Sequence, residues 1–219
     1  KIVWFSSKNP VKHGTYVDQG KMVYAYENEV KKICAIEEIF LPGEHNIENA
    51  LAAAAIAMLL AIPIPVIRHT LRTFKGVEHR IEIVKTDKGI TYINDSKGTN
   101  VDSTLKAIAA MKEPTAIILG GYDKQVDFSL LAKAIKDHEN MVGVVLIGET
   151  AKKIEKALTK VQFTNLQHGA SLKEAVRKAS EMVNKGGTVL LSPACASFGM
   201  FENYEQRGIA FKNIVEELS

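Results

Sequence analysis

The sequence has little cysteine and little net charge, and each shortage excludes a class of protein. Two cysteines, Cys34 and Cys195, occur in 219 residues. They provide neither a disulfide framework nor metal-ligand spacing, so we expect a reducing, cytoplasmic location. The formal net charge of +3 is too small to predict nucleic-acid binding. The many lysines are explained as solvated helix faces.

The sequence also lacks an apolar run long enough for a membrane span. Residues 50–67 are mostly apolar, but Pro63 and Pro65 interrupt them. About a dozen residues remain before these prolines, fewer than the ~20 that a bilayer requires. We therefore expect a buried helix and no membrane insertion. The chain opens in a strand-like Ile-Val-Trp-Phe run without a methionine, so we expect a fragment of a longer protein.

The hydrophobic pattern predicts two domains that meet near Gly76. Residues 1–76 contain short strand-like segments, followed by a helix that Asn46 can cap and by a second helix. Predicted strands lie at 2–6, 16–17, 22–26 and 32–36, and predicted helices at 47–61 and 65–74.

From residue 81 onward strands and helices alternate, which predicts a doubly wound α/β domain over 77–219 with a mainly parallel sheet. Two of its strands are apolar throughout, as expected where helices cover both faces of a sheet. The predicted strands are 90–94, 116–119, 142–147, 163–166 and 188–191, and the predicted helices are 101–111, 129–136, 150–158, 172–184 and 203–217.

Two polar motifs lie before this α/β domain or at its start. Asn46 and Asn49 are three residues apart, so they share one face at the beginning of a helix and can meet a polar ligand. Capping is the alternative explanation, and it accounts for Asn46 but not for Asn49. Arg80 lies at the proposed domain junction, where its guanidinium can pair with phosphate. The alternative is an ordinary surface arginine.

Three further motifs follow predicted strands. Asn94–Asn100 contains Asp95, Lys97 and Thr99, and a plain turn has no need of the lysine. Gly120-Gly121-Tyr122-Asp123-Lys124 allows close backbone approach and adds a positive charge, but it matches neither dinucleotide nor Walker A patterns.

The third motif is the run Ser192–Phe198, which contains Ser197 and precedes a helix. Since parallel α/β sheets bind ligands at the carboxyl ends of their strands, we expect Lys97, Thr99, Lys124 and Ser197 to converge there. Such a set suits a small anion, for example an amino acid with two carboxylates. We interpret Cys195 as a small buried residue, because no histidine is placed beside it.

Taken together, Asn-Asp-Ser-Lys-Gly-Thr-Asn and Leu-Ser-Pro-Ala-Cys-Ala-Ser-Phe make the chain resemble the Mur ligase family, and within it the D-glutamate-adding ligases. The resemblance implies that residues 1–76 end a central ATP-binding domain and that 77–219 form the D-glutamate-binding domain. It implies an ATP- and Mg²⁺-dependent ligation of D-glutamate to UDP-N-acetylmuramoyl-L-alanine through an acyl phosphate, in peptidoglycan synthesis. A monomeric complete enzyme is expected.

The same resemblance implies residue roles. Asn46 and Asn49 would face the adenine, Arg80 the ATP phosphates and Asp95 the ribose. D-glutamate would be held by Lys97, Thr99, Lys124, Ser197 and Tyr204, with Lys97 and Lys124 acting in catalysis. The family's phosphate loop and magnesium ligands correspond to no part of this sequence, so we expect no metal site and no activity from this chain alone.

Two residues depart from the family pattern. Gly98 replaces a usual alanine, which we expect to be a mild change, and Gly199 replaces a common aspartate. Three other interpretations stay open: another Mur or folylpolyglutamate-type ligase, an inert nucleotide- or amino-acid-binding module, and an NAD-dependent dehydrogenase. The missing third glycine argues against the dehydrogenase.

Overall fold

The computed structural model describes residues 2–41 and 43–218, which divide into two compact units. The first unit ends at Gly76 and the second begins at Val77. Each unit has its own sheet and its own buried core. Each is therefore described by itself.

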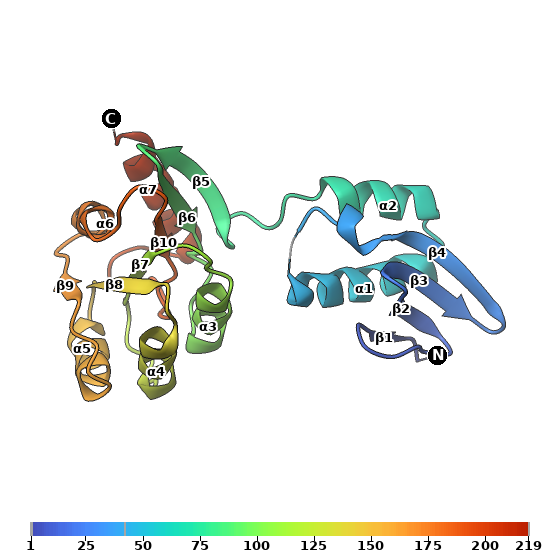
Figure 1. Ribbon diagram of the computed structural model, residues 1–219, viewed down its shortest axis with the longest axis horizontal. Coiled ribbons are helices and arrows are strands. Elements are labelled where there is room, and N and C mark those ends of the chain that lie inside the picture. The colour runs from blue at the N-terminus through green and yellow to red at the C-terminus, as the bar shows by residue number, and fades with distance from the viewer. Residues whose placement is uncertain (1, 42, 219) are drawn as a thin grey trace. The chain divides into compact units, whose positions relative to one another are not determined.

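The first unit pairs a sheet with two helices (Figure 1). Its strands run in the order β1-β2-β3-β4, with β1 parallel to β2 and the other pairs antiparallel. Met22, Ile33, Leu51 and Ile67 form the centre of its core, so strands and helices share one apolar layer. The elements are β1 Trp4–Ser6, β2 Gly14–Asp18, β3 Lys21–Tyr26, β4 Glu29–Ala35, a 3-10 turn Ile36–Glu38, α1 Glu44–Leu59 and α2 Ile64–Thr73.

The start of α1 differs from the sequence prediction. The N-cap is Gly43, without a side-chain hydrogen bond, and the helix begins at Glu44. Asn46 therefore lies inside the first turn and is not the cap, so capping no longer explains it. Pro63 caps α2 and Pro65 occupies its first turn, where a missing N–H costs no helical hydrogen bond.

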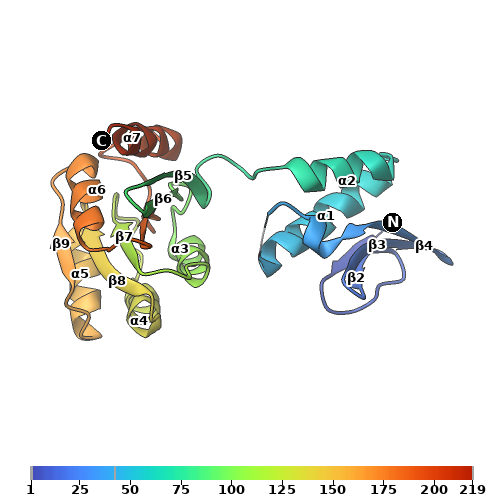
Figure 2. The same cartoon turned by 45° about the horizontal axis from the view of Figure 1, so that its top comes forward.

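The second unit contains a twisted sheet in the order β5-β6-β10-β7-β8-β9 (Figures 1 and 2). All neighbouring strands are parallel except β5 and β6, which form an antiparallel pair. The strands are β5 Glu82–Asp87, β6 Ile90–Asn94, β7 Thr115–Leu119, β8 Met141–Leu146, β9 Leu166–His168 and β10 Thr188–Leu191.

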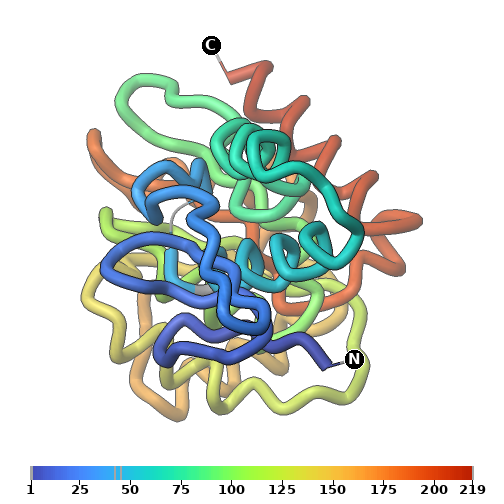
Figure 3. The backbone as a smooth tube through the Cα atoms, turned by 90° about the vertical axis from the view of Figure 1, so that its right-hand side faces the viewer, coloured from blue at the N-terminus to red at the C-terminus, as the bar shows by residue number. Residues whose placement is uncertain are grey.

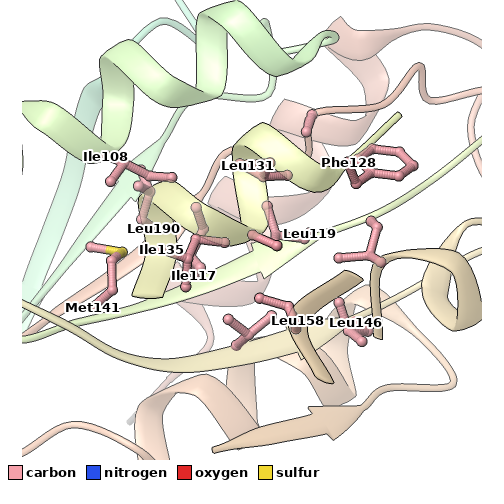
Figure 4. Close-up of a cluster of buried hydrophobic side chains, with 14 of the residues drawn as sticks. Ile108, Ile117, Leu119, Phe128, Leu131, Ile135, Met141, Leu146, Leu158 and Leu190 are labelled. Atoms are coloured by element: carbon pink, nitrogen blue, oxygen red, sulfur yellow. The ribbon is translucent and has the colours of Figure 1, made fainter. Parts of the chain in front are cut away.

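Helices cover both faces of this sheet. Alternate strand residues divide between two cores: Ile117, Leu119 and Leu190 face α3, α4 and α5, as Figure 4 shows, whereas Ile118 and Leu191 face α6 and α7. The last helix, α7, leads to the C-terminus (Figure 3). The helices are α3 Val101–Ala109, α4 Ser129–Asp137, α5 Ala151–Lys160, α6 Leu172–Glu181 and α7 Tyr204–Glu216.

The predicted doubly wound fold is confirmed, with two local errors. Strand β5 was not predicted, although its hairpin with β6 turns through Lys88 and Gly89, both at positive φ. Strand β9 begins at Leu166, where the predicted strand 163–166 ends. Both errors concern edge strands, whose one-sided burial gives a weak hydrophobic pattern. Within residues 2–41 and 43–218, no helix is both long and apolar enough to span a membrane.

Candidate substrate-binding edge of the second unit

Three loops of the second unit lie at one edge of its sheet. Strand β10 pairs in parallel with β6 on one side and with β7 on the other. The loops that begin at Asp95, Gly120 and Ser192 therefore leave the sheet side by side at the carboxyl ends of their strands. In open α/β sheets this edge binds ligands. The predicted convergence of the Lys97, Lys124 and Ser197 loops is thus present in the fold.

The loop after β7 is tied to the loop after β10 through backbone contacts. Gly120 N–H donates to Pro193 O at 2.8 Å, and Tyr122 N–H donates to Ala196 O at 3.0 Å. A Cβ on Gly120 would lie 2.0 Å from the carbonyl oxygen of Ile147, and one on Gly121 would lie 2.3 Å from that of Ala196. The glycine pair therefore serves close packing between loops and strands.

The loop after β6 carries Lys97 against the start of α7. The ammonium Nζ donates to Tyr204 Oη at 2.9 Å and lies 4.4 Å from the ring centroid. The tyrosine thus offers the lysine both a hydroxyl acceptor and a π face. The Asn203 side chain caps α7 by accepting from Gln206 N–H at 2.7 Å, and this cap fixes where Tyr204 enters the helix.

Asp95 lies beneath the same loop and is 4% exposed. Its Oδ2 accepts from Ser192 Oγ at 2.6 Å, and its Oδ1 accepts from Ile81 N–H at 3.3 Å. Burial raises the pKa of Asp95 to about 6, despite these hydrogen bonds and the fields of Arg80 and Arg207. A ribose contact would require this carboxylate to become accessible.

The sequence analysis expects the exchange of glycine for alanine at position 98 to be mild, but the structure leaves no room for an alanine side chain at Gly98. A Cβ at this position would lie 2.6 Å from Asp95 Oδ2 and 2.7 Å from Ser192 Oγ. Both of those side chains are buried, so an alanine would displace the bond between them. In this chain, the Asp95–Ser192 hydrogen bond therefore depends on the absence of a side chain at position 98.

Arg207 on α7 is a buried cation that the sequence analysis did not single out. It is 1% exposed. Its Nε donates to Ser96 Oγ at 2.9 Å, Nη2 to Ser96 O at 2.8 Å and Nη1 to Cys195 O at 3.1 Å. Burial lowers its pKa to about 10. The sequence feature that could have pointed to Arg207 is its position four residues after Asn203, on the helix that follows the β10 motif.

Beside α7, a small charged cluster joins the start of the unit to β5. Lys212 Nζ lies 2.9 Å from Glu78 Oε1 and 2.8 Å from Glu82 Oε1. Burial has the largest single effect on the pKa of Glu82 and raises it, but the hydrogen bonds from Lys212 and from His79 N–H, together with the nearby positive charge, outweigh burial and lower the pKa. Glu78, His79 and Glu82 are close enough together to ligate a metal ion. The lysine ammonium already provides positive charge at this point.

The remaining predicted residues lie as follows. Arg80 and Lys124 are exposed, Thr99 is half-buried and Ser197 is 3% exposed. Cys195 is a buried free thiol whose pKa is raised by burial, as its interpretation as a small buried residue requires. In the first unit, Asn46 and Asn49 share the first two turns of α1, and Asn49 is the more exposed.

Sequence comparison assigns this architecture to a family. Residues 79–195 match the family model described as Mur ligase, glutamate ligase domain. This match covers more than half of the 219 residues, and the chain belongs to the Mur ligase family.

The whole chain is also similar to curated proteins called UDP-N-acetylmuramoylalanine--D-glutamate ligase. Identity is 47% with the protein of Thermoanaerobacter sp. (strain X514) and 48% with that of Caldanaerobacter subterraneus subsp. tengcongensis. Each alignment covers 100% of this chain and 48% of the relative. The chain thus spans about half the length of these relatives.

Solved structures show the same fold at low sequence identity. UDP-N-acetylmuramate-alanine ligase from Thermotoga maritima aligns with a TM-score of 0.66 and 19% identity, over 98% of this chain and 48% of its own. A pseudomurein peptide ligase from Methanothermus fervidus aligns with a TM-score of 0.62 and 20% identity, over 97% and 43%.

Proposed function

We propose that the complete protein carrying this chain is an ATP-dependent ligase that joins D-glutamate to UDP-N-acetylmuramoyl-L-alanine. The observation that carries the proposal is the 47–48% identity, over the whole chain, to relatives with this named activity. The lysine- and hydroxyl-bearing sheet edge supports it, because a dicarboxylate requires cationic and hydrogen-bonding partners.

The proposed reaction has two steps. A carboxylate oxygen of UDP-N-acetylmuramoyl-L-alanine attacks the γ-phosphorus of ATP, which forms an acyl phosphate and releases ADP. The D-glutamate amine then attacks the acyl carbon, phosphate leaves and the nitrogen loses a proton. Lys97 and Lys124 are proposed to hold the D-glutamate carboxylates, and Thr99, Ser197 and Tyr204 to complete the pocket. Their contribution is positioning and charge stabilisation.

We propose ATP-binding residues within each unit. In the first unit, Asn46 and Asn49 share one stretch of α1 and offer amides to the adenine. In the second, Arg80 is exposed and suits phosphate, whereas Asp95 reaches a ribose only if it leaves its buried position. Mg²⁺ would offset the phosphate charge, and we propose that its ligands lie outside this chain. ADP-bound relatives include the MurF ligase from Thermotoga maritima.

The proposed setting is the cytoplasmic synthesis of peptidoglycan precursors, and through it cell shape and division. We further propose that the complete protein is a monomer and that this chain alone is inactive. A measurable turnover of ATP and D-glutamate by residues 1–219 alone would contradict the last point.

The test uses the complete protein with UDP-N-acetylmuramoyl-L-alanine, ATP and either D- or L-glutamate. Phosphate release that requires all three substrates and the D enantiomer supports the proposal. Release with L-glutamate, or with another amino acid in its place, points to a different ligase of the family. Absence of turnover together with retained ligand binding points to a binding module.

Lysine variants locate the site within this protein. Lys124→Ala and Lys97→Ala are expected to raise the KM for D-glutamate at least about tenfold, because each removes a charge-assisted hydrogen bond. Lys133→Ala is the matched control, since Lys133 is an exposed lysine of α4 paired with Asp137. An unchanged KM for D-glutamate in both lysine variants would show that D-glutamate does not bind at this edge.

A further inference from the structure

Arg207 joins two of the loops that form the substrate-binding edge. Two of its three hydrogen bonds go to Ser96, which precedes Lys97, and the third goes to the carbonyl of Cys195, two residues before Ser197. Ser96 Oγ also donates to Tyr204 O at 2.8 Å. One guanidinium therefore fixes the backbone from which the proposed glutamate contacts project.

Packing alone does not explain why a cation, the guanidinium of Arg207, is buried here. A charge that is 1% exposed loses its hydration, and such charges are normally compensated by an ionic partner. The acceptors of Arg207 are two carbonyls and a hydroxyl, and Asp95 acts on it only through its field. An apolar side chain would fill the same space without this cost, but it would leave the two loops unconnected.

The shape of the guanidinium matches the positions of its three acceptor oxygens. Its planar, rigid fork directs Nε and Nη2 at the two oxygens of Ser96 while Nη1 points to Cys195 O. A lysine ammonium is a single point charge and cannot reproduce these three directions.

We propose that Arg207 is a positioning residue that sets the separation and orientation of the Lys97 and Ser197 loops for glutamate. It does not touch the substrate. This inference rests on the proposed function and extends it to a residue outside the predicted set. Misplacement of reacting groups by about 1 Å costs about a hundredfold in rate, so a residue that acts only on the loops can still have a large kinetic effect.

The experiment compares Arg207→Lys, Ser96→Ala and the double variant in the complete protein, with Arg177→Lys as control. Arg177 is an exposed arginine of α6 that pairs with Glu181. Steady-state kinetics are measured with D-glutamate and ATP varied separately, together with thermal unfolding.

We expect Arg207→Lys to lower kcat/KM for D-glutamate by about tenfold or more, while the KM for ATP changes less than about twofold. Ser96→Ala keeps the two carbonyl bonds and should cause a smaller loss in the same parameter. The double variant should be no worse than Arg207→Lys, because both substitutions break one network.

Three results would overturn the inference. One is a kcat/KM for D-glutamate within about twofold of the parent. Another is a fall in kcat that only follows the folded fraction, with the KM for D-glutamate unchanged, since that is the signature of a purely structural residue. If Arg207→Lys does not fold, Ser96→Ala decides, and an unchanged KM for D-glutamate in it refutes positioning. Absence of ligation by the unsubstituted protein would instead refute the proposed function, and this inference with it.

Discussion

Asp95 gives a sharp prediction about stability and pH. Its folded-state pKa of about 6 lies above the ordinary value of 3.8, so the folded protein holds this proton to higher pH than the unfolded chain does. The contribution of Asp95 to the stability of the folded state is therefore greatest below about pH 4. This contribution is lost as the pH rises through about 6. The difference between the two pKa values corresponds to roughly 3 kcal/mol.

The perturbation is Asp95→Asn, which keeps the shape and cannot ionise. Its amide oxygen can still accept from Ile81 N–H, and its NH₂ can donate to Ser192 Oγ. Between pH 4 and pH 7.5 the parent should lose about 2.5 kcal/mol of stability relative to the variant, because the unfolded carboxyl is already partly ionised at pH 4. Every other titrating group is common to both proteins and cancels in this difference.

The assay is denaturant unfolding followed by far-UV circular dichroism at a series of pH values. Fluorescence is unsuitable, because the single tryptophan, Trp4, lies in the first unit and not in the one that contains Asp95. Parallel pH profiles for Asp95→Asn and the parent would refute the reasoning. They would mean that the carboxylate is solvated or compensated in the folded state.

Three further substitutions test the packing of the second unit. Gly208→Ala would place a Cβ 2.3 Å from Nδ1 of the buried His79. The free energy of unfolding should therefore fall by at least about 2 kcal/mol, seen as a lower midpoint of thermal unfolding. An unchanged midpoint would show that the α7 backbone and the His79 ring move apart easily. Asn203→Ala removes the cap hydrogen bond to Gln206 N–H and should cost about 1 kcal/mol in denaturant unfolding, while Asn203→Ser should recover most of it. Leu131→Ala, in the α3–α5 core, should cost about 2–5 kcal/mol by the same measurement, and a loss below 1 kcal/mol would show that the cavity collapses.

Most of the second unit's architecture could be predicted because its signals are local. The buried strands β7 and β10 are short apolar runs, and a helix such as α7 begins directly after its capping asparagine. Strands β6 and β10 were predicted with the same first and last residues that the structure shows. The edge strand β5 was missed because its burial pattern mixes half-buried and exposed positions, which gives neither an apolar run nor a clean alternation.

The candidate site shows a similar division. Lys97, Lys124 and Ser197 could be assigned to one edge because parallel strands end on the same side of a sheet. Arg207 could not be assigned, since its importance comes from contacts with Ser96 and Cys195, which lie 111 and 12 positions away in the sequence. The tightness around Gly98 was also invisible, because Ser192 reaches it from another strand.

The sequence by itself determined most of the alternation of strands and helices from residue 90 onward and the motifs that indicate the family. Local periodicity and turn chemistry suffice for these, since they act between neighbours in the chain. Only the tertiary structure decided that Asp95 is buried with a raised pKa, that Arg207 joins two loops and that Lys97 rests on Tyr204. Burial and hydrogen-bond geometry depend on residues that folding brings together, and no local pattern in the chain encodes them.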